Sequence, residues 1–159
     1  MINGIHHVSF STTDIDRMLA FYRDLLGCSE AIETGEIRPG FVEFETLVGM
    51  KNTAGRAALL EAGNIKIEIF QYTHPVPRPT ETRPACDGGI RHLAFDVTDL
   101  KSEYERLKAA GTTFVSEPQL LANVGVLSVY ARDPDGNILE LQELLPNSSV
   151  PRMSRDANS

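Results

Sequence analysis

The chain is poor in the features that mark several protein classes. It has only two cysteines, Cys28 and Cys86, and no tryptophan among its 159 residues. Two cysteines this far apart do not make a disulfide framework, so the sequence favours a reducing setting. No apolar run is long enough to cross a bilayer, and the first residues lack the basic and apolar segments of a secretory signal. We therefore expect a cytoplasmic protein with no membrane partner.

Positive charge is also scarce. The chain has 15 Lys and Arg against 22 Asp and Glu, a formal net charge of −7. Nucleic-acid binding needs a basic face to neutralise phosphates, and no glycine-rich phosphate loop is present either, so we expect no nucleic-acid partner. The hydrophobic content of 42% and charged content of 23% are those of an ordinary globular protein. The length fits one domain, or two small modules that share a core.

The chain does contain an internal repeat. Residues 4–10 read Gly-Ile-His-His-Val-Ser-Phe, and residues 89–95 read Gly-Ile-Arg-His-Leu-Ala-Phe. His7 and His92 stand at the same place in the two phrases, and each phrase is followed by a Thr-Asp pair. A repeat of this kind predicts two structural units of the same plan.

Each half follows one pattern of elements. Residues 4–11 alternate as a strand does, Thr13-Asp14 offers a helix N-cap, and apolar residues then follow at helical spacing up to Gly27. Thr98-Asp99 and Gly111 bound the corresponding helix in the second half. About three strands follow each helix, with turns at Gly63-Asn64 and at 133–136. The pattern predicts an α+β fold of two βαβββ modules in a curled mixed sheet, with the helices on its outer face.

The expected boundaries follow from turn and proline signals. The first module covers residues 1–72 and the second covers 89–145, and together they make one domain. Residues 73–88 are rich in proline and are expected to connect the modules, while the polar residues 146–159 are expected to form a loose tail. Residues 35–52 have no clear counterpart in the second half, and we expect a short helix or flap there.

Strand alternation groups the candidate site residues. On their strands, His7, Glu68, His92 and Glu140 project away from the face expected to pack under the helices. A single strand histidine is more often structural than a ligand, but here four equivalent positions carry metal-binding groups. Two imidazoles and two carboxylates suit a divalent ion such as Ni, Co, Zn, Fe or Mn, with coordination positions left for substrate. We assign His6 a structural role.

The chain resembles the vicinal oxygen chelate superfamily, which includes glyoxalase I, methylmalonyl-CoA epimerase, extradiol dioxygenases and bleomycin-binding proteins. The resemblance covers roughly residues 3–144. It is carried by the His-His-Val start, Phe21-Tyr22, residues 89–92 and the Asp-Pro-Asp-Gly-Asn run at 133–137. It implies paired βαβββ modules that form a cup around one divalent metal, with His7, Glu68, His92 and Glu140 as ligands. It also implies a homodimer.

The implied activity is that of a metal-dependent isomerase, epimerase or lyase. The ligand set is similar to that of glyoxalase I and methylmalonyl-CoA epimerase, in which a carboxylate removes a carbon-bound proton and the metal stabilises an enolate or enediolate. Glu68 or Glu140 is the expected catalytic base, with Glu43, Glu45 and Glu61 as alternatives. The expected substrate is a small molecule, such as a thioester or a glutathione adduct.

Two other functions stay open. One is an extradiol-type ring-cleaving dioxygenase, against which the Glu68 ligand argues. The other is a metal-free protein that sequesters a small molecule, as bleomycin-binding proteins do. An anionic substrate would also need a basic patch, for which the candidates are Arg38, Lys51, Arg56, Lys66 and Arg91.

Overall fold

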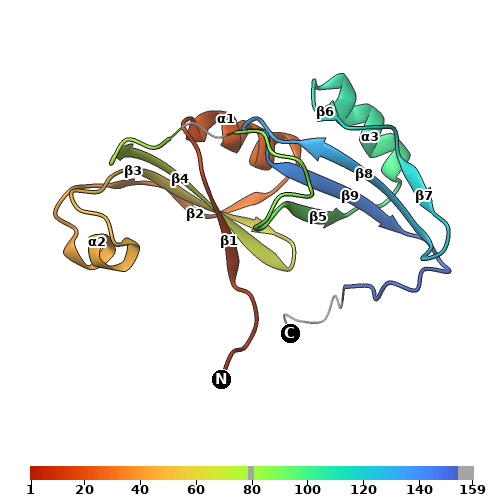
Figure 1. Cartoon of the computed structure of the whole chain (residues 1–159), viewed down its shortest axis with the longest axis horizontal. Coiled ribbons are helices and arrows are strands. Elements are labelled where there is room, and N and C mark those ends of the chain that lie inside the picture. The colour runs from red at the N-terminus through yellow and green to blue at the C-terminus, as the bar shows by residue number, and fades with distance from the viewer. Residues whose placement is uncertain (79–80, 154–159) are drawn as a thin grey trace. The chain divides into compact units, whose positions relative to one another are not determined.

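The computed structural model describes residues 1–78 and 81–153, and Figure 1 shows their course. The chain divides into two compact units, Met1–Thr80 and Glu81–Ser159. This division falls inside the segment 73–88 that we expect to connect the modules, while the module boundaries themselves stay a prediction. Residues 79–80 of that connector and 154–159 of the expected tail lie outside the described residues.

Unit 1 has a four-stranded sheet in the order β1-β4-β3-β2. β1 pairs with β4 in parallel, and the other pairs are antiparallel, so the sheet is mixed. The sheet strands, in chain order, are β1 (His7–Ser11), β2 (Ser29–Ile37), β3 (Ala54–Ala62) and β4 (Ile65–His74). A helix between β1 and β2, and a second between β2 and β3, complete the unit.

The first helix of unit 1 begins where the sequence predicts. Asp14 is the N-cap, and its carboxylate accepts a hydrogen bond from the Arg17 N–H at 3.0 Å. The helix runs as α1 (Ile15–Leu19) and continues as a π-helical turn, η1 (Ala20–Leu25). Its apolar face is fully buried at Ile15 and Met18, which lie in the core of the unit. The run stops at Gly27, whose φ of +81° suits a residue without a side chain.

The second helix of unit 1, α2 (Val42–Val48), lies in the segment where a short helix or flap is expected. Figure 1 shows it beyond the ends of β2 and β3. None of its seven residues is buried, and Leu47 is 80% exposed. α2 therefore contributes little to the core of unit 1.

Unit 2 repeats the plan with a five-stranded sheet. Its main order is β5-β9-β8-β6, and a further short strand, β7, also pairs with β8. β5 and β9 are parallel, as β1 and β4 are in unit 1, and the other pairs are antiparallel. The elements are β5 (His92–Asp96), α3 (Leu100–Ala109), β6 (Thr113–Phe114), β7 (Gln119–Leu121), β8 (Val126–Arg132) and β9 (Ile138–Leu144).

In both units, a strand side chain attaches the N-terminus of a helix to the sheet by hydrogen bonds. In unit 1, Gln71 of β4 accepts a hydrogen bond from the Ile15 N–H at 3.3 Å and donates to the Thr13 carbonyl at 2.9 Å. In unit 2, the Glu143 carboxylate of β9 accepts from the Leu100 N–H at 3.0 Å. The bonds from the Ile15 and Leu100 N–H groups satisfy donors that the start of a helix leaves without a backbone partner. The helix-facing side of each sheet is thereby identified.

The buried residues agree with this assignment. Ile67 and Ile69 of β4 and Leu139 and Leu141 of β9 are at most 2% exposed, and they alternate with the predicted carboxylate ligands. The predicted α+β class, with mixed sheets and with α1 and α3 each against one face of its own sheet, is confirmed. Each unit has its own open sheet.

Candidate functional site

In unit 1 the structure brings together His7 and Glu68, the first His–Glu pair. His7 Nε2 lies 3.4 Å from Glu68 Oε2. The parallel register of β1 and β4 places Glu68 opposite Ser9, so its side chain shares a face with His7. Neither side chain is buried: 42% of the His7 and 28% of the Glu68 side chain is exposed. The pair is therefore open to a ligand.

In unit 2 the same arrangement joins His92 and Glu140, the second His–Glu pair. His92 Nε2 lies 3.3 Å from Glu140 Oε2, and Glu140 stands opposite Ala94 in the parallel register of β5 and β9. In both units the glutamate thus stands opposite the residue two positions after the histidine. The sequence repeat predicts one imidazole–carboxylate pair in each unit, with the same geometry in both.

The groups that support the two pairs differ. In unit 1, His6 Nδ1 lies 2.9 Å from His7 Nδ1, at hydrogen-bond distance. His6, to which we assign a structural role, is exposed and precedes β1. In unit 2, the Ser128 hydroxyl of β8 donates to Glu140 Oε1 at 2.6 Å, and the Tyr130 ring lies beside the His92 ring, with the centroids 5.4 Å apart and the planes at 39°.

The positions of Ser128 and Tyr130 beside the second His–Glu pair were not predicted from the sequence. Tyr130 stands opposite Glu140 in the β8–β9 register, and Ser128, two residues earlier, shares that face. The available signal was a serine between two apolar residues of β8, Leu127 and Val129, and its side chain is buried at 8% exposure. A buried hydroxyl requires a hydrogen-bond partner, and the facing carboxylate supplies it.

A tyrosine lies near the carboxylate of each pair. Burial raises the pKa of the Tyr72 phenol, and the negative charge of Glu68 raises it further. Burial likewise raises the pKa of Tyr130, with the charge of Glu140 as the second cause. Both phenols therefore stay protonated at neutral pH and are able to donate a hydrogen bond.

The alternative carboxylates are placed differently. Glu45 accepts a hydrogen bond from the Gly40 N–H at 2.9 Å, which is the main cause that lowers the pKa of Glu45. Glu61 pairs with Lys66 at 3.2 Å. Glu43 lies exposed on α2. Glu45 and Glu61 thus have partners of their own, which leaves Glu68 and Glu140 as the carboxylates that face a histidine.

Most of the five candidate cations for a basic patch have partners of their own in the structure. Arg38 pairs with Glu36 and Arg56 pairs with Asp16, each at 2.8 Å, and Lys66 is held by Glu61. Arg91 donates to the carbonyl of Ile90. Most of these cations are balanced by a nearby carboxylate, as solvated surface charges commonly are.

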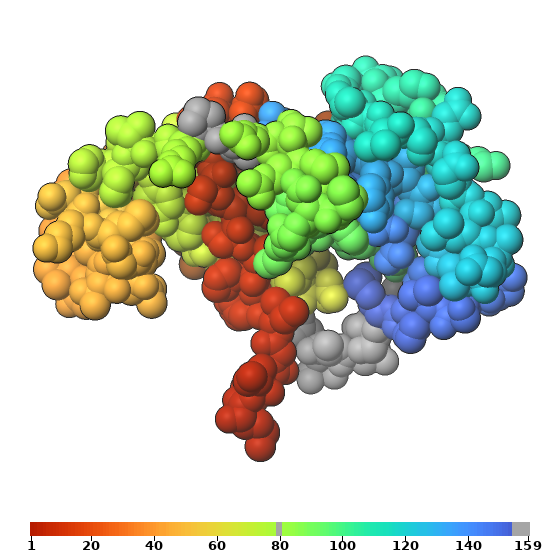
Figure 2. Space-filling view, viewed as in Figure 1, coloured from red at the N-terminus to blue at the C-terminus, as the bar shows by residue number. Residues whose placement is uncertain are grey.

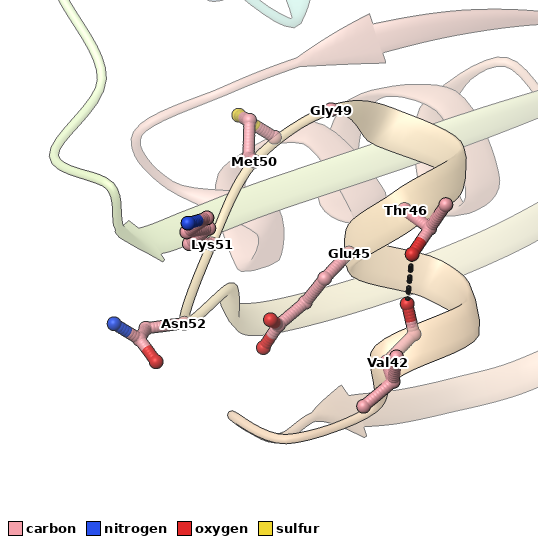
Figure 3. A pocket seen from close by; sticks show the side chains of 7 residues that line it. All are labelled: Val42, Glu45, Thr46, Gly49, Met50, Lys51 and Asn52. Atoms are coloured by element: carbon pink, nitrogen blue, oxygen red, sulfur yellow. Dashed lines mark hydrogen bonds between the residues drawn. The ribbon is translucent and has the colours of Figure 1, made fainter.

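A cavity of about 450 Å³ lies against α2 in unit 1 (Figure 3). Figure 3 shows the Glu45 side chain extending from the helix toward the segment at Lys51 and Asn52. Backbone N–H groups of Asn52 and Thr53 also bond to this carboxylate, so Glu45 closes the loop after α2. The lining holds none of the four predicted ligands. It consists of Val42, Glu45, Thr46, Gly49, Met50, Lys51 and Asn52.

Across the described residues, 1–78 and 81–153, no group of three or more His, Cys, Asp or Glu side chains that could hold a metal is found. Each unit by itself supplies two such side chains. The assignment of all four to one metal remains a prediction. In the same part of the chain, no helix is both long and apolar enough to cross a membrane.

Comparison with known proteins identifies the family. The model of the glyoxalase/bleomycin resistance protein/dioxygenase superfamily matches residues 4–141. The chain belongs to this superfamily. The glyoxalase superfamily match spans both units, and the predicted resemblance to the vicinal oxygen chelate proteins is thereby confirmed.

Characterised relatives within the superfamily include epimerases. The chain is 29% identical to the ethylmalonyl-CoA/methylmalonyl-CoA epimerase of Cereibacter sphaeroides, over 91% of this chain and 100% of that protein. It is 28% identical to a 2-epi-5-epi-valiolone epimerase of an Actinomyces species, over 89% of this chain and 79% of that protein.

Solved structures show the same fold. A glyoxalase family protein from Bacillus cereus matches with a TM-score of 0.81 at 20% identity, over 91% of this chain and 96% of that one. The fosfomycin resistance protein FosX of Listeria monocytogenes, solved with Mn(II) and sulfate, matches with a TM-score of 0.60 at 19% identity, over 90% and 93% of the two chains.

Proposed function

We propose that the protein is a divalent-metal-dependent enzyme that isomerises or epimerises a small oxygenated substrate, or cleaves it as a lyase. The metal ligands are His7, Glu68, His92 and Glu140. The observation that carries the proposal is the equivalence of the two His–Glu pairs, which have the same strand register and nearly the same Nε2–Oε2 distance in two units.

The donor set fits a borderline divalent metal. Imidazole nitrogen and carboxylate oxygen suit Mn, Fe, Co, Ni and Zn, whereas thiolate ligands are not involved. The Mn(II) in FosX supports a divalent metal. The two relatives named as epimerases support the class of reaction. When bound, such a metal would stabilise negative charge that develops on a substrate oxygen.

The chain's own residues supply proton transfer and positioning. A carboxylate is the base that removes the carbon-bound proton, and Glu68 and Glu140 are the candidates because each faces a histidine. Ser128 holds Oε1 of Glu140, while no hydrogen bond to Oε1 of Glu68 is found among the described residues. Glu68 is therefore the freer of the two carboxylates to exchange partners during a reaction.

Metal content and proton exchange test the proposal. The purified protein should bind close to one Mn(II) or Co(II) per chain, and His7→Ala and His92→Ala should each reduce the metal affinity by at least about tenfold. Exchange of a carbon-bound hydrogen for solvent deuterium next to a carbonyl, measured by NMR on thioester and 2-oxoaldehyde-derived compounds, reports the reaction. His74→Ala, in an exposed residue at the end of β4, is the matched control.

The alternatives predict other outcomes. Iron-dependent oxygen uptake on a catechol without deuterium exchange would favour ring cleavage. Protein that binds no metal and still holds an apolar compound would favour sequestration, and the enzymatic proposal would then be abandoned.

A further inference from the structure

We propose that unit 1 binds a flat, apolar group of the substrate on an aromatic surface made by Phe44, Phe70 and Tyr72, next to Glu68. This rests on the proposed function, because it takes the oxygens of that substrate to lie near Glu68. The substrate class named is a small compound with two neighbouring oxygen donors and an aromatic or similarly flat apolar substituent.

Strand alternation places the surface beside the predicted ligand. Glu68, Phe70 and Tyr72 are two residues apart along β4, so their side chains share one face of the sheet. The residue between the two rings, Gln71, bonds to the start of α1 on the opposite face. The two rings therefore lie on the side of the sheet that carries the first His–Glu pair.

The rings form a continuous series. Phe70 and Tyr72 stack with centroids 5.4 Å apart and an angle of 13° between their planes. Phe44 of α2 follows at 6.0 Å from Phe70, and Phe41 stacks on Phe44 at 6.0 Å. Phe44, Phe70 and Tyr72 are half-buried, and Phe41 is 55% exposed. These rings therefore keep solvent-accessible surface and are not fully buried in the hydrophobic core of unit 1.

Small residues flank Phe70 on both neighbouring strands. Ser11 and Ala57 stand opposite Phe70, whereas Glu68 lies between Ser9 and the larger Leu59. Large side chains at positions 11 and 57 would fill the space above the rings. Aromatic rings that are stacked but partly accessible are suited to a further ring at a centroid separation of about 4.5–7 Å.

Charge on the same face argues against a polyanionic group. Lys66 shares the face of Glu68, and Glu61 neutralises it at 3.2 Å. Arg56 lies on the other face of the sheet, opposite Gln71, where it pairs with Asp16 of α1. A phosphate-bearing carrier would meet balanced charges here, whereas an apolar ring would meet three aromatic side chains.

A pair of chelating probes tests the surface. Benzohydroxamate and acetohydroxamate carry the same two oxygens and differ in a phenyl or a methyl group. Titration calorimetry with the full-length, Mn(II)-loaded protein should give a Kd about tenfold lower for benzohydroxamate, the size expected of one or two aromatic contacts. Phe70→Leu should remove most of this preference and leave the Kd of acetohydroxamate unchanged.

The matched control is Phe114→Leu. Phe114 is a half-buried ring of β6 that packs on Tyr104 in unit 2, and its replacement should leave both Kd values unchanged. In protein shown to bind Mn(II), equal affinity of the two probes for the wild-type protein, or a preference that survives Phe70→Leu, would overturn the aromatic surface.

A metal-free arm separates this proposal from the proposed function. Phenylacetate added to the apoprotein should give intermolecular NOEs between its ring and the ring protons of Phe70 and Tyr72. Protein that binds no Mn(II) but shows these NOEs loses the proposed function and keeps the aromatic surface. Protein that binds Mn(II) but shows neither the NOEs nor the phenyl preference keeps the function and loses the surface.

Discussion

The two His–Glu pairs share a register and a separation, yet the side chains behind them differ. Ser128 donates to Glu140, whereas the β3 residue in the corresponding place, two before the residue opposite Glu68, is Ala57. The Glu140 side chain is also less exposed than that of Glu68, at 17% against 28%. Glu140 is thus the better fixed of the two carboxylates.

This difference predicts the effect of Ser128→Ala. Removal of the hydroxyl frees one oxygen of Glu140, and loss of a hydrogen bond to a metal-binding carboxylate commonly weakens metal binding by about tenfold or more. We expect the Kd for Mn(II), measured by EPR titration, to rise by about that factor. Ser128→Thr keeps the hydroxyl and should restore most of the affinity. An unchanged Kd in Ser128→Ala would show that the hydrogen bond does not position Glu140 for the metal.

At the scale of the element, the turn between β8 and β9 places the second pair. Asp133, 5% exposed, accepts hydrogen bonds from the N–H groups of Asp135 and Asn137 and from the Asn137 side chain, at 2.8–3.0 Å. Gly136 follows with a φ of +83°. These bonds set the register with which β9 returns, and so determine that Glu140 and not Leu139 faces His92.

Asp133→Ala should therefore destabilise unit 2. It leaves three donors in a partly buried turn without their acceptor, and we expect the free energy of unfolding to fall by about 2–4 kcal/mol. Urea unfolding followed by circular dichroism measures it. Asn64→Ala, in the exposed turn of the corresponding hairpin in unit 1, should change stability by less than about 0.5 kcal/mol. A similar small change for Asp133→Ala would contradict this account of the turn.

The start of α3 predicts a pH dependence. Asp99 caps the helix, and hydrogen bonds from the Ser102 hydroxyl and N–H lower the pKa of its carboxyl below the ordinary value of 3.8. A pKa that is lower in the folded protein means that the ionised group stabilises the fold above about pH 4. That contribution is lost as the pH falls through the folded-state pKa.

The Tm of Asp99→Ala should accordingly lie below that of the wild type at pH 6, and the gap should narrow toward pH 3. Asp99 also has a positive φ of 56°, which asparagine tolerates better than alanine does. Asp99→Asn is therefore the control, with a smaller loss of Tm at pH 6 and the same narrowing of the gap toward pH 3, because both variants lack the titrating carboxyl. A gap between wild type and Asp99→Ala that stays constant from pH 6 to pH 3 would argue against an ionic cap.

Sequence patterns were sufficient for the features that depend on alternation and helix signals. Asp14 and Asp99 cap helices as expected, and His7, Glu68, His92 and Glu140 leave their strands on the face opposite the helices. The prediction of a strand from residue 4 was wrong, since β1 begins at His7. Residues 1–6 are exposed, and Figure 2 shows them, in red, extending from unit 1.

Contacts between strands were beyond the reach of the sequence. Ser128 meets Glu140 only because β8 and β9 pair in one register, and alternation within a strand does not reveal a register. The attachment of α2 through Phe44 and Phe70 was missed for the same reason, since those rings are far apart in the chain. The second module also has two short strands, β6 and β7, where unit 1 has β2, with Pro118 between them.

At the scale of the whole molecule, metal binding and stability should be linked. A ligand that binds only the folded protein stabilises it, by about 2.7 kcal/mol when its free concentration is a hundredfold above its Kd. Mn(II) at that level should raise the Tm by several degrees, and EDTA should reverse the shift. Differential scanning fluorimetry of the full chain measures both.

Each half of the chain contributes one pair, so neither pair should suffice. His7→Ala and His92→Ala should each remove most of the Mn(II)-dependent shift in Tm, although the two residues belong to different units. With EDTA present, both variants should have the same Tm as the wild-type protein. A shift abolished by only one of the two substitutions would indicate that a single unit holds the metal.

The bonds that attach each helix to its sheet have a consequence for folding. Gln71 and Glu143 each lie three residues after a predicted ligand, on the opposite face of the same strand. A strand that slipped by one residue would turn its carboxylate inward and, in the same movement, withdraw the anchor from the helix. The same strand register therefore serves both functions. A molecule whose ligand strand is out of register also loses the hydrogen bonds that attach the helix to the sheet.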